Sequence, residues 1–486
     1  MDSLFASIVG MRQPSRSQSS GIIPVGGLRE LWTDHNLQKV MPKSLTHTEI
    51  IFAQEHLLRT ISLLVYVEVP DVGQIILGLI ESKRRFDDYL HMVEATDLSF
   101  SLHKAKLELF LNLRYLFTTP VLTQGEDITL QGVQEMPLVG SESLGRGMNG
   151  TVTGHTIPRG HLRRRERGLV KPNSQEILVA VKTFRDPNAS QQEISILKAL
   201  RDLLHNKEIQ IGVCFSIVTE RSEVHSLSFR ATSNLKEKLW ELQTNGEEGF
   251  DSDRFMACVK QIKGIVEAVE FLHNNESSGP NTCYCHMDIK PENILVFEPD
   301  PSSPVGKWQL IDFGITTISE KRSSRTDGGA REEGTHRHIT ITVGTTARAL
   351  ASRYQPPEIN SNIPRLERGE SGTYMGRGSD VWSLACVFAE VVAANLGELS
   401  DLHNLDYFYE KARKAWIRHA FPGVSKWKRH HSFNDWLENL RARGESHPDL
   451  KTCQDLIVKM THIKRIRRLK SKQLLERMRK FLELNG

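Results

Sequence analysis

The 486-residue chain contains no apolar run of the roughly 18 to 20 residues that a membrane-spanning helix needs. The apolar stretches at 63–67 and after Trp382 are short, and Glu390 interrupts the second. The first ten residues carry an acid at Asp2 and no basic leader, which makes them a poor secretory signal. We therefore expect a soluble protein without a transmembrane segment.

Cysteine and excess charge are scarce as well. No Cys-x-x-Cys pair occurs, and Cys283 and Cys285 have the wrong spacing for zinc, so the cysteines fit reduced thiols in a cytoplasmic protein; they are Cys214, Cys258, Cys283, Cys285, Cys386 and Cys453. The 63 basic and 59 acidic residues leave a net charge of +4, too small to predict a nucleic-acid partner. The 39% hydrophobic content excludes disorder of the whole chain.

The N-terminal quarter divides by pattern. Residues 1–27, rich in Ser, Arg, Pro and Gly from Gln13 on, are predicted to be a flexible lead-in. Residues 28–118 carry helical periodicity, with helices expected near 46–64, 72–93 and 102–116, the first opened by a capping box at Thr46 and Glu49. Simple packing is favoured for this region, and a partner-binding or membrane-active bundle is the alternative; its partner is unknown. Residues 119–137 form a linker.

Polar side chains gather in one stretch, Cys285 to Leu295, and again in Ile311 to Gly314. These stretches supply the carboxylates of Asp288 and Asp312, the amide of Asn293 and the ammonium of Lys290. Phosphoryl transfer needs such a set, because the protein must hold metal ions against a nucleotide, neutralise charge and orient a hydroxyl. The pattern His-x-Asp-x-Lys-x-x-Asn, followed by Asp-Phe-Gly, resembles the catalytic core of the eukaryotic protein kinases.

The resemblance assigns a role to each residue of this core. Asp288 would be the catalytic base or hydroxyl-orienting carboxylate, acting through proximity rather than through an unusual pKa. Lys290 would neutralise the transferred phosphoryl group, and its presence indicates serine and threonine substrates. Asn293 and Asp312 would hold two Mg²⁺ ions.

Upstream patterns complete the likeness. Gly145-x-Gly147-x-x-Gly150 would bring its backbone over the ATP phosphates, and Lys182 would grip them while it pairs with Glu193 on the next helix. Val152, Ala180 and Leu295 would enclose the adenine. The long stretch between Val152 and Lys182 is interpreted as a solvated hairpin extension rather than a nucleic-acid patch, because no aromatic residues alternate with its five arginines, Arg159, Arg163, Arg164, Arg165 and Arg167.

Further along the chain the resemblance implies structural roles. A helix over 255–273 would support the catalytic loop, Asp380 would hold the backbone of that loop, and Glu358 would pair with Arg468. The basic run from Lys464 to Lys472 is favoured as a solvated helix face with a stripe of Ile466, Leu469 and Leu474; a nuclear-localisation signal is the alternative.

Departures from the family pattern matter as much. Met287 replaces the arginine that receives an activation-segment phosphate in many kinases, so activity independent of that phosphate is expected. The activation segment, 312–358, is long, and its charged middle at 320–337 is expected to be mobile. Ala351, next to Ser352, stands where the family usually has a threonine, which puts substrate positioning in doubt.

We therefore predict an α+β, bilobal protein-kinase fold over residues 138–480, with a small antiparallel-sheet lobe and a large helical lobe, preceded by the helical region. The expected activity is Mg²⁺-dependent transfer of the γ-phosphoryl group of ATP to serine or threonine hydroxyls of a protein substrate. A pseudokinase scaffold that binds nucleotide and a partner is the alternative. The whole arrangement resembles poorly characterised kinase-like proteins of filamentous fungi.

Overall fold

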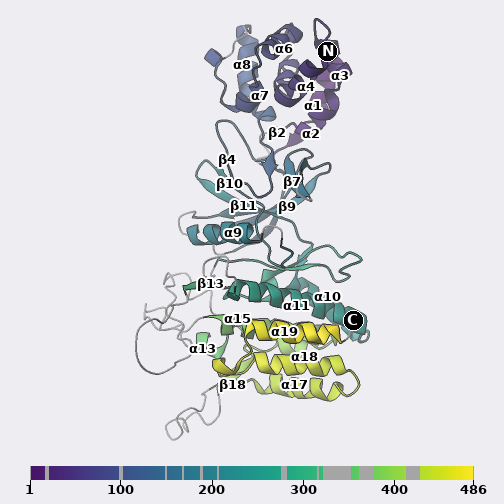
Figure 1. The fold of residues 1–486 in the computed structure, drawn as a ribbon, viewed down its shortest axis with the longest axis vertical. Coiled ribbons are helices and arrows are strands. Elements are labelled where there is room, and N and C mark those ends of the chain that lie inside the picture. Colours follow the sequence, from purple (N-terminus) through teal and green to yellow (C-terminus); the bar gives the residue numbers. More distant parts are fainter. Residues whose placement is uncertain are drawn as a thin grey trace. The chain divides into compact units, whose positions relative to one another are not determined.

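The computed structural model describes residues 2–16, 21–97, 102–147, 150–166, 169–186, 190–204, 207–274, 282–314, 317–320, 352–360, 376–411 and 427–484. The chain divides into two compact units, drawn in Figure 1. The first comprises Met1–Gln191 and Cys214–Arg230, and the second comprises Gln192–Val213 and Ala231–Gly486. Both helices and sheets are present, as the α+β prediction requires.

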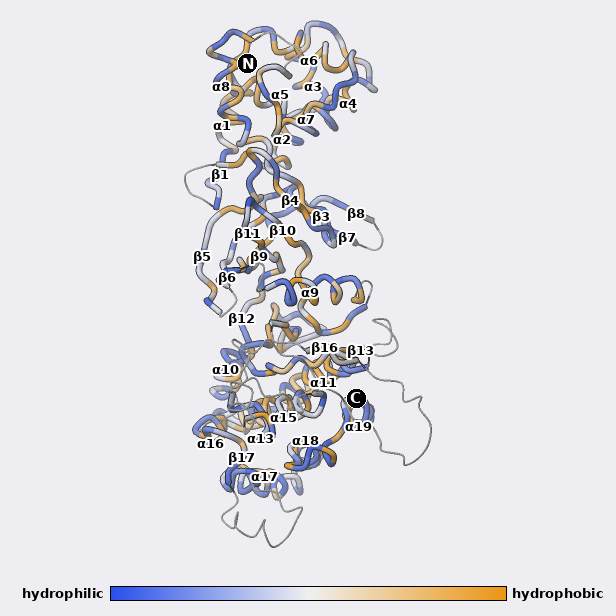
Figure 2. Tube along the Cα trace, turned by 90° about the vertical axis from the view of Figure 1, so that its left-hand side faces the viewer, coloured by the Kyte–Doolittle hydropathy of each residue, from blue (hydrophilic) through white to orange (hydrophobic). Residues whose placement is uncertain are grey.

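The first unit begins with a helical region around its own apolar core, coloured orange in Figure 2. Helix α5 is its centre, because seven of its nine residues are buried. The helices are α1 (Asp2–Gly10), α2 (Val25–Leu31), α3 (Asp34–Val40), α4 (His47–His56), α5 (Leu58–Tyr66), α6 (Val72–Glu81), α7 (Phe86–Tyr89), η1 (Leu90–Met92), η2 (Ala95–Asp97), α8 (Lys104–Leu113) and η3 (Arg114–Phe117).

Two expectations for this region differ from the structure. The predicted lead-in contains α1, whose Leu4 and Ile8 are buried in the helical core. The helix expected over 72–93 breaks after Glu81, where Lys83 takes a left-handed φ of 52°, and resumes only as short turns. The capping box is confirmed, because the Thr46 hydroxyl accepts from Glu49 N and the Glu49 carboxylate accepts from Thr46 N.

The first unit also contains a six-stranded sheet, in the order β4-β10-β11-β9-β6-β5. All its pairs are antiparallel except β4 with β10. Its apolar core includes Val179, Val181 and Leu227. The strands are β4 (Ile128–Thr129), β5 (Val139–Arg146), β6 (Gly150–Ile157), β9 (Ile177–Phe184), β10 (Ser216–Glu220) and β11 (Glu223–Phe229).

The arginine-rich insertion joins the helices to this sheet. Its hairpin, β7 (Leu162–Glu166) and β8 (Leu169–Pro172), pairs with β3 (Leu122–Thr123). Before the hairpin, buried His161 accepts a 3.0 Å hydrogen bond from Val25 N and lies 2.9 Å from the carbonyl of Pro120, and Arg159 forms an ion pair with Glu30. The insertion is therefore not merely a solvated extension, because its base is packed against the helical region.

The N-terminal strands also reach the large sheet. Strand β1 (Gln13–Pro14) pairs with β2 (Gly21–Ile22), and Ser15 then bridges to Val139 at the start of β5. Arg16 N donates to the carbonyl of Leu138 at 3.0 Å, and its guanidinium lies 3.8 Å from Glu220. Residues far apart in the sequence thus form one folded unit.

The second unit is mostly helical and is built around α15, most of which is buried. Its helices are α9 (Gln191–Leu203), α10 (Leu235–Glu247), α11 (Ser252–Asn274), η5 (Pro291–Asn293), α13 (Pro357–Asn360), α15 (Arg377–Asn395), α16 (Leu399–His403), α17 (His431–Arg443), α18 (Pro448–Met460), η7 (Arg465–Arg467) and α19 (Ser471–Glu483). Its strands are β12 (Ser233–Asn234), β13 (Thr282–Cys285), β14 (Ile294–Val296), β15 (Trp308–Leu310), β16 (Thr317–Glu320), β17 (Tyr409–Lys411) and β18 (Trp427–Arg429).

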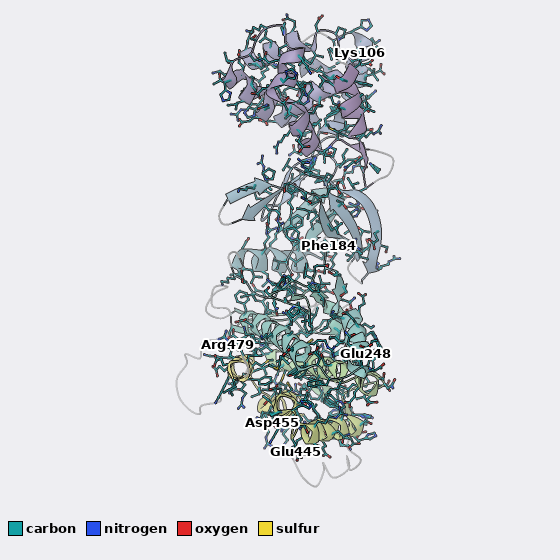
Figure 3. All side chains as sticks on the ribbon, turned by 90° about the vertical axis from the view of Figure 1, so that its right-hand side faces the viewer. Lys106, Phe184, Glu248, Glu445, Asp455 and Arg479 are labelled. Carbon is teal, nitrogen blue, oxygen red and sulfur yellow. The ribbon has the colours of Figure 1, made fainter. Side chains whose placement is uncertain are left out.

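The C-terminal basic run differs from its predicted form. Ile466 is 88% exposed within η7, so it belongs to no buried stripe, whereas Leu474 is buried on α19. The side chains of this part of the chain, including Arg479 on α19, are drawn in Figure 3. Across the described residues, no helix is both long and apolar enough to cross a membrane.

Candidate active site

The loop after β13 brings three of the predicted site residues together in the second unit. Lys290 Nζ lies 2.7 Å from Asp288 Oδ2. The side-chain amide of Asn293 donates to the same oxygen at 2.9 Å and to the backbone carbonyl of Asp288 at 2.8 Å. The carboxylate of Asp288 is thereby fixed from two sides.

Asp312 follows a strand that runs beside this loop. Strand β15 pairs with β14, and one residue later Ile311 N donates to the carbonyl of Asn293 at 2.9 Å. His286 Nε2 lies 2.9 Å from the carbonyl of Ile311, and its ring packs edge-on against Phe313 at 5.1 Å. These contacts on both sides hold Asp312, whose φ is +66°, near the catalytic loop.

Asp380 on α15 fixes the backbone of the catalytic loop at His286 and Met287. Its two oxygens accept from His286 N at 2.9 Å and from Met287 N at 2.8 Å, which confirms the structural role expected for it. His273 at the end of α11 contacts Asp380 at 2.8 Å and Ser471 at 3.1 Å. Cys285 lies near this pair, but both ring nitrogens of His273 are engaged, so the trio is a hydrogen-bonded support rather than a metal site.

Electrostatics at Asp288 reflect its buried position. Burial raises the pKa of the Asp288 carboxyl, Lys290 lowers it through charge and a hydrogen bond, and the nearby charge of Asp312 raises it. Lys290 therefore favours the ionised form that a hydroxyl-orienting group requires.

The donor set fits Mg²⁺. Carboxylate and amide oxygens are the ligands that hard cations prefer, and Asp312 and Asn293 supply one of each. The amide nitrogen of Asn293 is held by Asp288, which leaves the amide oxygen on its opposite edge. Asn293 and Asp312 are therefore the residues suited to hold a metal ion bound to a nucleotide.

The residues predicted to contact the nucleotide lie mainly on the first unit. Gly145 lies in β5, and Val152 and Ala180 lie in β6 and β9. A Cβ at Gly150 would collide with the carbonyl of Thr183, whereas a Cβ at Gly145 meets no atom within 4 Å. Gly150 is therefore required by the close approach of β9, and the role of Gly145 over the phosphates stays a prediction. Met148 and Asn149 lie outside the described residues.

Lys182 and Glu193 belong to different units. Lys182 lies on β9 opposite Val152, with its Nζ 5.4 Å from the centre of the Phe184 ring. Glu193 is buried in the first turn of α9, and Leu295 lies in β14. The ion pair between Lys182 and Glu193 stays a prediction, as do the nucleotide contacts of Lys182 and Leu295.

The end of the activation segment is anchored as predicted. Arg468 is 5% exposed, and its guanidinium holds Glu358 through two hydrogen bonds of 2.6 and 2.8 Å. The same group donates to the carbonyls of His462 and Gly378. The predicted mobile middle of the segment at 320–337 and the substitution at Ala351 fall outside the described residues, apart from Glu320.

A second anchor was missed from the sequence. Glu390, fully buried in α15, accepts from the Tyr354 hydroxyl at 3.0 Å and lies 3.2 Å from the guanidinium of Arg353. Arg353 also donates to the carbonyls of Leu402 and His403. A single acid within the apolar run after Trp382 was the available signal, because a buried carboxylate needs partners.

Glu390 should make stability depend on pH. Burial raises its pKa from 4.5 to about 7 against the opposing charge of Arg353 and the Tyr354 hydrogen bond, with smaller effects from Glu292 and Lys236. The folded state holds a proton that the unfolded state releases, so this contribution is complete below pH 4.5 and is lost as pH rises through about 7. We expect the Glu390→Gln variant to gain up to about 3 kcal/mol relative to wild type between pH 5 and pH 8.

Urea unfolding of both proteins across this pH range measures the difference. The Glu267→Gln variant is the control, because Lys263 and Arg479 lower the pKa of that half-exposed carboxyl and its pH dependence should have the opposite sign. A pH-independent difference between wild type and the Glu390→Gln variant would contradict the prediction.

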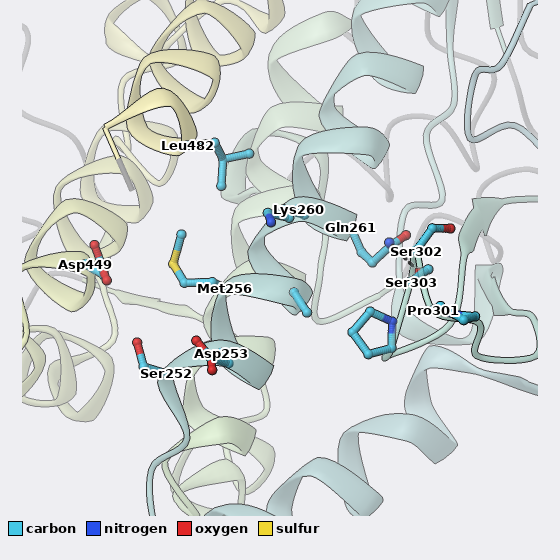
Figure 4. A pocket seen from close by; sticks show the side chains of 12 residues that line it. Ser252, Asp253, Met256, Lys260, Gln261, Pro301, Ser302, Ser303, Asp449 and Leu482 are labelled. Atoms are coloured by element: carbon cyan, nitrogen blue, oxygen red, sulfur yellow. Dashed lines mark hydrogen bonds between the residues drawn. The ribbon is translucent and has the colours of Figure 1, made fainter. Parts of the chain in front are cut away.

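A cavity of about 520 Å³ lies elsewhere in the second unit, between α11, α18, α19 and the loop after β14 (Figure 4). Its lining includes Asp253, Lys260, Asp449 and Leu482. Gln261 in its wall donates to the Ser303 hydroxyl at 2.9 Å and so ties that loop to α11. None of the predicted site residues lines it, so it is separate from the catalytic loop.

Comparison with known proteins points in one direction. The family model described as "Protein kinase domain" matches residues 141–478. Human mitogen-activated protein kinase kinase kinase 19 is 27% identical over 250 residues, or 51% of this chain and 15% of that protein. Human calcium/calmodulin-dependent protein kinase type IV is 30% identical over 177 residues, or 36% and 30% of the two chains. Schizosaccharomyces pombe serine/threonine-protein kinase ppk23 is 23% identical over 326 residues, or 64% and 67%.

Proposed function

This chain belongs to the protein kinase family, and we propose that it transfers the γ-phosphoryl group of ATP to serine or threonine hydroxyls of proteins. The observation that carries this proposal is the cluster of Asp288, Lys290 and Asn293, joined within 3 Å, with Asp312 next to Ile311, whose N donates to the carbonyl of Asn293. The name of the Schizosaccharomyces pombe relative, serine/threonine-protein kinase ppk23, adds support for the hydroxyl class.

Each residue has a definite task in this reaction. Asp288 accepts a hydrogen bond from the substrate hydroxyl and orients its oxygen, and Lys290, beside it, offsets the negative charge of the transferred group. Asn293 and Asp312 would hold Mg²⁺, which would supply further charge neutralisation. We further expect Lys182 to pair with Glu193 and to bind the ATP phosphates under the backbone of Gly145, Gly147 and Gly150, and Val152, Ala180 and Leu295 to enclose the adenine.

The test of hydroxyl specificity is direct. The full chain with ATP and Mg²⁺ is given three degenerate peptide pools in which serine, threonine or tyrosine is the only phosphate acceptor. Phosphate on the serine and threonine pools supports the proposal. Transfer to the tyrosine pool alone contradicts it.

Regulation by phosphate is expected to be weak. Met287 is 1% exposed and carries no charge, so the catalytic loop offers no guanidinium at this position to bind a phosphate. Phosphatase treatment should therefore change the turnover rate by no more than about 2-fold. Mass spectrometry confirms removal of the phosphate, and a loss of most of the activity would refute this expectation.

The alternative function is a weakly active or inactive scaffold that binds nucleotide and a protein partner. Among the residues that the structure describes, Met287 departs from the family pattern, and this departure favours the scaffold. ATP turnover distinguishes the two, because a scaffold would give the same background signal before and after replacement of Asp288. A membrane-active role for the helical region is separate, and failure of the full chain to sediment with liposomes would remove it.

A further inference from the structure

The peptide unit before Asp288 has an uncommon conformation. Met287 has φ +68°, a left-handed value that costs a residue with a Cβ free energy. Such a conformation persists only where surrounding contacts hold it. Asp380 provides one contact, since its Oδ1 accepts from Met287 N at 2.8 Å.

Gln355 provides the contact on the other side. This residue is 1% exposed, and its side-chain amide donates to the carbonyl of Met287. That carbonyl belongs to the peptide bond that continues into Asp288. The backbone that carries Asp288 is therefore held by a carboxylate on α15 and by an amide from the end of the activation segment.

Gln355 is itself held on both sides. The preceding Tyr354 is fixed by its hydroxyl on Glu390 and by its carbonyl, which accepts from the Ser383 hydroxyl at 2.9 Å. Three residues beyond Gln355, Glu358 is fixed by Arg468. The amide of Gln355 thus connects two buried anchors to the catalytic loop without any net charge.

We propose that Gln355 is a positioning residue for Asp288, the uncharged link through which the end of the activation segment sets the orientation of that carboxylate. This inference rests on the proposed function. It extends that function by stating how the catalytic loop is ordered without a phosphate. The link is a hydrogen bond from an amide side chain, so its formation requires no phosphorylation and its loss requires no phosphatase.

Two variants test the link. Gln355→Glu has almost the same shape but, in its ionised form above neutral pH, offers no donor to the Met287 carbonyl, and Gln355→Leu removes all polarity. Both should lower kcat about 10- to 100-fold, because a displaced Asp288 no longer orients the hydroxyl. ATP affinity of the Mg²⁺-loaded full chain should change by less than about 2-fold, since the predicted nucleotide contacts remain.

Gln243→Leu is the matched control. Gln243 is also a buried glutamine whose amide donates to a backbone carbonyl, that of Gly397 at 2.8 Å, at the opposite end of α15. It should lower the melting temperature as the Gln355 variants do, while kcat stays within about 2-fold of wild type. If Gln355 had only a structural role, substitutions at Gln355 and at Gln243 would change kcat to a similar extent.

The outcomes separate cleanly. A fall in kcat at Gln355 with ATP binding retained, and none at Gln243, supports the positioning role. Unchanged kcat in the folded Gln355→Glu variant overturns it, as does a proportional loss of kcat and ATP binding in every variant. Absence of turnover in the wild-type protein overturns the proposed function itself, and the positioning role with it.

Discussion

Replacement of Asp288 by asparagine is expected to lower phosphoryl transfer by about 10³-fold or more, because the amide cannot accept the proton of the substrate hydroxyl as a carboxylate does. The change preserves the shape of a residue that is 9% exposed. It removes the charge that pairs with Lys290 at 2.7 Å. Affinity for ATP should stay close to that of wild type.

Transfer of labelled phosphate to the peptide pools measures the loss, and binding of a fluorescent ATP analogue shows that the variant is folded. Asp435→Asn is the matched control, because Asp435 is exposed on α17 and takes no part in the catalytic loop. Equal turnover by wild type and the Asp288→Asn variant would favour the scaffold instead.

Loss of Arg468 is expected to be the most destabilising of the proposed changes. Arg468→Met removes two hydrogen bonds from the half-buried Glu358 carboxylate and takes donors away from the carbonyls of His462 and Gly378. It also removes the guanidinium that lies 4.9 Å from the centre of the Trp382 ring. Because Arg468 is buried but the Glu358 side chain is 25% exposed, we expect a loss of about 3 kcal/mol of unfolding free energy, the lower end of the cost of breaking a fully buried pair.

Urea unfolding followed by tryptophan fluorescence gives this cost. The matched control is Arg479→Met, which breaks the exposed pair with Glu267 and should cost no more than about 1 kcal/mol. The double variant Arg468→Met with Glu358→Met should regain part of the loss, because the carboxylate that loses the two hydrogen bonds of Arg468 is then absent as well. Similar losses of unfolding free energy for Arg468→Met and Arg479→Met would contradict the role of Arg468 as the anchor of Glu358.

The catalytic loop could be predicted because its chemistry is local. Asp288, Lys290 and Asn293 lie within six residues, and a short loop between strands can only bring such neighbours together. The Glu358 and Arg468 pair is 110 positions apart, and only the family likeness pointed to it. The same likeness predicted the role of Asp380 correctly.

Other features left too little signal in the sequence. Strands β1 and β2 have two residues each, too few for an alternating pattern, and α1 shows only Leu4 and Ile8 as its buried contacts. The contact between Gln355 and Met287 involves a residue with a left-handed backbone, and a methionine at position 287 does not predict that conformation. The likeness to kinase-like proteins of filamentous fungi stays a prediction.

The packing of His161 against Val25 and Pro120 has a consequence for exchanging parts between proteins. The helical region before residue 118 packs against the arginine-rich insertion. This insertion, which contains β7 and β8, lies in the sequence between strands β6 and β9 of the large sheet. A graft of these helices onto another catalytic domain must therefore bring residues 158–173 along. Cutting the chain at residue 141 would remove both hydrogen-bond partners of the buried His161 imidazole. The helical region and the insertion therefore have to be transferred together.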